Sequence, residues 1–213
     1  MLSVRPSIKN SLSVIRNKDE IIARWISHVV SPHIVGVVVT SAMALEYSPD
    51  PLKALLWLFG LMPLLVLPPL GYLLWLVRRG KLADIYMPER ETRLRPLTLM
   101  MVWLLICWGL IRHWQAPSVV EMFVLAATVM IGVLSLVTLF WKISFHGATI
   151  TAAATATMLI AGSSAWPVML LVPLVGWARV RLERHTPRQV IFGSLVGALI
   201  ALILVHGAIF SVS

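Results

Sequence analysis

Long apolar runs restrict the fold of this chain more than any other feature, because several of them reach the ~20 residues that a helix needs to cross a bilayer. They cover residues 25–45, 52–77, 97–111, 119–140, 147–161, 167–178 and 190–210. Inside a bilayer the backbone polar groups of such a run must find partners within the run, which favours α-helix. The sequence therefore predicts an all-α, polytopic transmembrane helical bundle of six to seven spans, with seven the preferred number.

The composition excludes several other classes of protein. Hydrophobic residues make up 59% of the 213 residues, which leaves too few charges to cover a water-facing surface. The formal net charge is +9, but the cations cluster between apolar runs and no aromatic-rich basic module accompanies them, so no nucleic-acid partner is expected. The single cysteine, Cys107, lies inside an apolar run and allows neither a disulfide framework nor a cysteine-based metal site.

The first 24 residues differ from the remainder, since they are polar and basic with apolar residues spaced roughly as one helical face. This pattern predicts a basic interfacial helix at 1–24, followed by a transmembrane domain at 25–213. A secretory signal is the alternative, because Ala42, Met43 and Ala44 resemble a cleavage site after an apolar run. The long charged segment before that run favours retention in the mature protein.

The cations indicate the orientation of the bundle. With seven spans, the N-terminus and the loops at 78–96, 141–146 and 179–189 share one side, which holds every Lys and Arg except Lys53 and Arg112. The positive-inside rule makes this side cytoplasmic. We therefore expect an integral protein of a bacterial or archaeal plasma membrane, with these loops in the cytoplasm.

The three loops of this side carry most of the reactive side chains. Arginine guanidinium groups match phosphate oxygens in pairs, one histidine can attack phosphorus, and a second can protonate the leaving oxygen. This combination predicts phosphoryl transfer without a metal or other cofactor, and metal-site motifs such as HExxH are absent from the sequence. The side chains are Asp84, Arg90, Arg93 and Arg95; Lys142, Ser144 and His146; and Arg179, Glu183 and His185.

The last of these loops ends in a helix-start pattern. Thr186 suits the N-cap, Pro187 the first helical position, and Gln189 the return bond of a capping box. His185 would then lie just outside a helix N-terminus, whose dipole favours a bound phosphate and a neutral imidazole. Arg179 lies six residues earlier, ~120° away on an unbroken helix, so a turn between the two residues is needed for both to reach one phosphate.

Glycines in the last apolar run indicate how its helix packs. Gly193 and Gly197 form a small-xxx-small pair, which predicts close approach to a neighbouring helix. The remaining histidines at 28, 33, 113 and 206 have no comparable set of basic partners and are interpreted as structural.

Three short patterns resemble the signature motifs of the type 2 phosphatidic acid phosphatase superfamily of membrane lipid phosphatases. They are Arg95-Pro96, Ser144-x-His146 and Arg179-x5-His185, and the resemblance covers roughly residues 78–200. It implies that His185 is the phosphate-accepting nucleophile and His146 the general acid. It also implies that Arg95, Ser144 and Arg179 bind the phosphate.

The chain departs from the motifs of this superfamily at two functional positions. Pro88 stands where the family has a lysine, so Arg90, Arg93 or Lys142 would have to replace it as phosphate ligand. Gln189 stands where the family has the aspartate that orients the nucleophile. Glu183 and Asp84 are the carboxylates that could take over this role.

These observations predict an integral membrane phosphatase that hydrolyses a lipid or prenyl phosphate or diphosphate through a phosphohistidine on His185. The alternative is a catalytically inactive relative that binds an anionic lipid or a partner protein, which Pro88 and Gln189 would suit. A transporter or scaffold has little support, because Glu121 is nearly the only charged residue within the runs. The head group, the chain length and the oligomeric state stay open.

Overall fold

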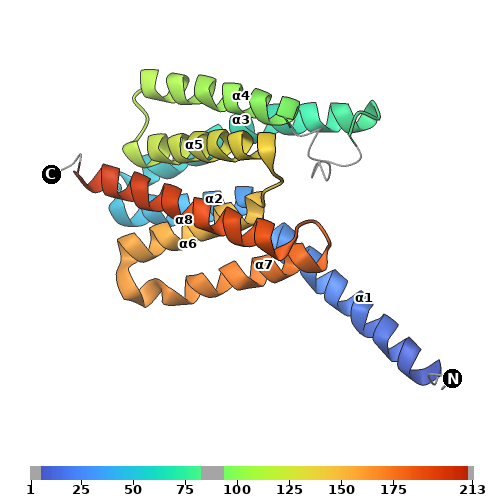
Figure 1. The fold of residues 1–213 in the computed structure, drawn as a ribbon. Helices are drawn as coiled ribbons and strands as arrows, with labels where there is room; N and C mark the ends of the chain where they lie inside the picture. Colours follow the sequence, from blue (N-terminus) through green and yellow to red (C-terminus); the bar gives the residue numbers. More distant parts are fainter. Residues whose placement is uncertain (1–5, 83–93, 211–213) are drawn as a thin grey trace.

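The fold is a helical bundle, seen in a computed structural model that describes residues 6–82 and 94–210, with side chains for 18–46, 48–82 and 94–205 (Figure 1). All regular secondary structure in this part of the chain is helical, which confirms the predicted all-α bundle. The elements are α1 (Pro6–Val29), α2 (Pro32–Tyr47), α3 (Pro51–Arg78), α4 (Leu94–His113), α5 (Ser118–Phe140), α6 (Phe145–Ala161), η1 (Gly162–Leu170), α7 (Leu171–Arg181) and α8 (Pro187–Phe210).

Five helical stretches of the described chain are long and apolar enough to span a membrane, or up to six if the bent pair α1 and α2 counts as one span. This count reaches six, the lower predicted number, and does not reach seven. The reason lies at residues 145–181, which count as one helical stretch although the chain reverses at η1. Gly162, with a φ of 74°, ends α6, and α7 then runs back alongside α6 (Figure 1).

The apolar run at 25–45 was predicted as a single span, but the structure bends it by 47° between α1 and α2. The cause is a helix start at Ser31 and Pro32. The Ser31 hydroxyl accepts from the Ile34 N–H at 3.5 Å, and Pro32 takes the first helical position. On the other side of the bend, α1 continues without interruption across the predicted boundary between residues 24 and 25.

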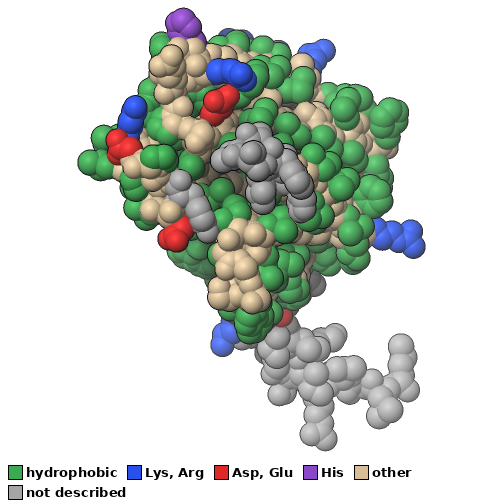
Figure 2. All heavy atoms as spheres, turned by 90° about the vertical axis from the view of Figure 1, so that its left-hand side faces the viewer, with side chains coloured by type: hydrophobic (Ala, Val, Ile, Leu, Met, Phe, Trp, Pro, Cys, Tyr) green, Lys and Arg blue, Asp and Glu red, His purple; other side chains and the backbone are tan. Residues whose placement is uncertain are grey.

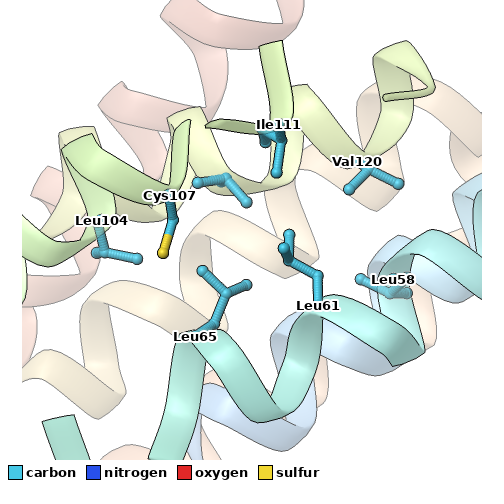
Figure 3. Close-up of a cluster of buried hydrophobic side chains, with 8 residues drawn as sticks. Leu58, Leu61, Leu65, Leu104, Cys107, Ile111 and Val120 are labelled. Carbon is cyan, nitrogen blue, oxygen red and sulfur yellow. The ribbon is translucent and has the colours of Figure 1, made fainter. Parts of the chain in front are cut away.

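Helices α3, α4 and α5 enclose a hydrophobic core (Figure 3). Leu58, Leu61 and Leu65 of α3 face Leu104, Cys107 and Ile111 of α4, and Val120 and Val124 of α5 complete the cluster. The buried thiol of Cys107 belongs to this packing.

Helix α3 contains three prolines, and one of them is compensated by a neighbouring helix. Pro68 has no N–H to donate to the carbonyl of Leu64, four residues earlier. The indole N–H of Trp103 on α4 donates to that carbonyl at 2.9 Å instead. The tryptophan thus links α4 to the backbone of α3.

Much of the outer surface is apolar, as expected of a protein surrounded by lipid. Exposed hydrophobic side chains include Trp25, Leu52 and Phe140, with exposed fractions of 67%, 68% and 82%. Figure 2 shows the end of the bundle away from α1, where hydrophobic side chains predominate and charged side chains are few. The surface therefore supports the prediction of a membrane protein.

Helices α6 and α8 pack with their backbones in close contact, and glycines make this approach sterically possible. A Cβ atom at Gly193 would lie 2.6 Å from the carbonyl oxygen of Ser144, and one at Gly197 would collide with the carbonyl of Ala148. The close packing predicted for this glycine pair is confirmed. It brings the start of α6 against the first turns of α8.

Candidate active site

Two of the three predicted site loops, at 141–146 and 179–189, lie at one end of the bundle. The connections from α5 to α6 and from α7 to α8 meet there, and α1 leaves the bundle at the same end (Figure 1). The side chains of Ser144, His146, Arg179 and His185 are all buried, with exposed fractions of 0%, 8%, 6% and 7%. Buried polar side chains are costly unless they find partners, so such a cluster requires an explanation.

The turn predicted between Arg179 and His185 is present. Helix α7 ends at Arg181, and the chain folds back so that the carbonyl of Arg179 accepts from the N–H groups of Arg184 and His185 at 3.1 and 3.3 Å. The capping box is also present. The Thr186 hydroxyl accepts from the Gln189 N–H at 3.4 Å, and Oε1 of Gln189 accepts from the Thr186 N–H at 3.2 Å.

Oε1 of Gln189 has a second contact, which favours one tautomer of the proposed nucleophile. It lies 3.2 Å from Nδ1 of His185. Because this atom already accepts from the Thr186 N–H, it must be the amide oxygen, and a neutral imidazole facing it must carry its proton on Nδ1. Nε2 of His185 then has a lone pair, as a nucleophile requires.

Ser144 begins α6 and ties this helix to α8. Its hydroxyl oxygen accepts from the Gly147 N–H at 3.2 Å, so it is the N-cap, and its backbone N–H donates to the carbonyl of Gln189 at 3.3 Å. The hydroxyl proton is not used by the capping bond and can be donated to an anion. Two helix N-termini therefore meet beside His185, and both favour negative charge.

His146 lies in the first turn of α6 and is the second buried histidine. Its Nε2 atom is buried and makes no hydrogen bond to any residue that the structure describes. The ring lies near enough to the Arg179 guanidinium to interact electrostatically, and a backbone group of Ser27 forms a hydrogen bond with it. A buried ring nitrogen beside a cation suits a ligand that is anionic and accepts hydrogen bonds.

Ser27 was not predicted as a site residue. It is buried in α1, and its hydroxyl accepts a hydrogen bond from Nη1 of Arg179 at 3.3 Å. The two residues are 152 positions apart in the chain. No local pattern marks this serine, so only the tertiary structure reveals it.

Among the remaining predicted site residues, those that the structure describes are less buried than the cluster. Arg95, at the start of α4, is exposed, and α4 packs on α3 and α5. Lys142 is partly buried next to Ile143 and Ser144, whereas Glu183 is exposed with a φ of 55°. Asp84, Arg90 and Arg93 lie outside the described residues. Their roles stay predictions.

Groups of three or more His, Cys, Asp or Glu side chains that could hold a metal ion are not found in the described part of the chain. The polar groups of the cluster are instead hydrogen-bond donors and imidazoles, namely Ser144, His146, Arg179 and His185. Such a set can bind a phosphate group and transfer its phosphorus to nitrogen.

Comparison with known proteins supports a phosphatase-type family. Residues 137–210 match the family model of the PAP2 superfamily. No curated protein and no solved structure matches the chain. The matched segment contains Ser144, His146, Arg179, His185 and Gln189, and it ends at the end of α8. Over this segment the chain is similar to the PAP2 superfamily, the phosphatase-type superfamily that its second and third motifs resemble.

Proposed function

We propose that the protein is an integral membrane phosphatase that hydrolyses a lipid or prenyl phosphate or diphosphate through a phosphohistidine on His185. The observation that carries the proposal is the contact between Gln189 and His185. It supports an imidazole whose ring proton is on Nδ1, inside a buried cluster that suits phosphate. Gln189 thereby provides the acceptor that the family aspartate would provide, which favours an active enzyme over an inactive relative.

The reaction has two steps. Nε2 of His185 attacks phosphorus, the bond from phosphorus to the leaving oxygen breaks, and a protonated His146 gives its proton to that oxygen. His146, now neutral, takes a proton from water, which attacks the phosphohistidine and releases inorganic phosphate and free His185. The substrate dianion favours protonation of His146 before the first step, because an opposite charge stabilises the imidazolium.

Three groups of the cluster bind the phosphate and stabilise the five-coordinate phosphorus. The Arg179 guanidinium matches two phosphate oxygens, and the Ser144 hydroxyl donates to a third. The N-termini of α6 and α8 add the positive ends of their helix dipoles. Arg90, Arg93, Arg95 and Lys142 are proposed as further ligands from the loops around the site.

The surroundings of the site support the proposed substrate class. An anion-binding cluster at the end of an apolar bundle suits a molecule with a phosphate head group and a hydrocarbon tail. The tail would remain in the bilayer while the head group enters the cluster. The positive-inside rule, applied to the cation-rich loops, supports the cytoplasmic leaflet as the location of this reaction.

The test is phosphate release by the purified protein in detergent, with polyprenyl diphosphate and phosphatidic acid as substrates. Wild type is compared with His185→Ala and with His113→Ala, a control at an exposed histidine at the end of α4. We expect loss of activity only in His185→Ala, and labelled phosphate on wild type after an alkaline quench, which preserves the phosphorus–nitrogen bond. Equal rates for His185→Ala and wild type would refute the enzymatic function.

A further inference from the structure

Helix α1 lies outside the segment shared with the PAP2 superfamily, yet it reaches the centre of the buried cluster. The shared segment begins at residue 137, whereas Ser27 of α1 accepts from Nη1 of Arg179 at 3.3 Å. The backbone of the same serine bonds to His146. One residue of α1 thus contacts a proposed phosphate ligand through its side chain and the proposed general acid through its backbone.

The position of Ser27 is fixed by the packing of α1 on α7. Ala23 is fully buried one helical turn before Ser27. A further turn back, Asp19 and Glu20 approach Arg181 of α7, with distances of 4.0 Å to Nε and 3.8 Å to Nη1. Residues spaced by three and four lie on one face of a helix, so a single face of α1 carries all these contacts.

The chemistry of Ser27 suits a group that holds a phosphate-binding arginine. A guanidinium has five N–H donors, and the bond to Ser27 uses only one of them. The hydroxyl is neutral, so it orients Arg179 without cancelling the charge that attracts phosphate. A carboxylate at this position would compete with the phosphate for the same guanidinium.

We propose that Ser27 is a positioning residue of the phosphate site, and that α1 therefore contributes to the active site. Its hydroxyl accepts from Nη1 and thereby fixes the orientation of the Arg179 guanidinium in the cluster. This inference rests on the proposed function, because it assigns Arg179 to phosphate binding. It also goes beyond that function, since neither the motifs nor the matched segment includes α1.

The experiment uses the full-length protein with serine variants and measures two quantities, the hydrolysis rate and the affinity for orthovanadate, which mimics five-coordinate phosphorus. Ser27→Ala removes the hydroxyl, Ser27→Thr keeps it, and Ser27→Asp introduces the competing charge. Ser135→Ala is the matched control, because its hydroxyl donates to the Ile131 carbonyl within α5. Thermal unfolding in detergent monitors the fold of every variant.

We expect Ser27→Ala to weaken orthovanadate binding and to lower kcat/KM about tenfold with unchanged thermal unfolding, as for loss of one hydrogen bond to a charged group. Ser27→Thr should retain most of the orthovanadate affinity and most of the wild-type kcat/KM. Ser27→Asp should abolish orthovanadate binding. Wild-type affinity and kcat/KM in Ser27→Ala would overturn the inference. It would also be overturned if both quantities fell only together with the thermal stability and Ser27→Thr showed the same losses.

The two readouts separate this inference from the proposed function. A wild-type protein that binds orthovanadate but hydrolyses no substrate would refute the phosphatase, while weaker binding by Ser27→Ala would still support the role of Ser27. A wild-type protein that does not bind orthovanadate would overturn both proposals.

Discussion

Gln189 holds His185 through a side-chain hydrogen bond of 3.2 Å, and it does so with the same oxygen that closes the capping box of α8. The start of the helix and the orientation of the proposed nucleophile therefore depend on one amide group. In this chain a neutral amide stands where the family motif has an aspartate. The amide orients the ring but adds no negative charge beside it.

Replacing Gln189 with methionine tests this dual role. Methionine has a similar length but cannot accept the bond from Nδ1 of His185, which leaves a buried donor without its acceptor. Such a loss costs about 1–3 kcal/mol, so we expect kcat to fall about 10- to 100-fold. Gln189→Glu keeps an acceptor oxygen and should retain activity, and similar rates for the two variants in the phosphate-release assay would contradict the role of Gln189.

The proposed roles of the two histidines predict different dependences on the leaving group. A general acid matters most when the leaving oxygen is strongly basic, typically by 10²- to 10⁴-fold. His146→Ala should therefore slow hydrolysis of an alkyl phosphate by about this factor but affect p-nitrophenyl phosphate much less. His185→Ala should abolish both reactions. Equal losses for both substrates in His146→Ala would exclude the general-acid role.

The glycine contact between α6 and α8 predicts a position-specific effect of added methyl groups. Gly193→Ala would place a Cβ atom 2.6 Å from the Ser144 carbonyl, which is backbone and cannot rotate away. We expect a destabilisation of about 1–3 kcal/mol together with loss of activity, because α8 would be displaced from the start of α6. Gly109→Ala on α4 is the control, since no atom lies within 4 Å of its added methyl group. Thermal unfolding and phosphate release should both be unchanged in that variant.

The contact between Trp103 and Leu64 predicts a coupling between two substitutions. Trp103→Phe leaves the Leu64 carbonyl without its indole donor and should lower the free energy of unfolding by about 1–3 kcal/mol. In the double variant with Pro68→Ala, the new backbone N–H can donate to that carbonyl, and the loss should be smaller. Denaturation in detergent measures both values. Additive effects would show that the proline and the tryptophan are independent.

Features that depend on near neighbours were predictable from the sequence. The capping box of Thr186 and Gln189 and the turn after Arg179 both follow from spacings of a few residues, and both are confirmed. The close packing at Gly193 was predictable because small residues four apart form a flat helix face. The positions of α3, α4, α5 and α8 also followed from the apolar runs.

Features that depend on distant contacts were not predictable. Ser27 resembles any other serine of an amphipathic helix, and its importance comes from a partner 152 residues away. The bend between α1 and α2 was missed because the apolar run continues through Ser31 and Pro32, although this pair is itself a helix-start signal. The exposure of Arg95 depends on which helices α4 packs against, and one sequence does not determine this.

The bond between the Ser144 N–H and the Gln189 carbonyl joins two peptide groups, so its existence does not depend on which side chains stand at 144 and 189. The loops and helices around it can therefore acquire new residues, and with them a new substrate preference. The spacing between the proposed nucleophile and the proposed acid would be inherited unchanged. In a bundle of this kind, substrate specificity can change during evolution while the geometry of the proposed reacting groups stays the same.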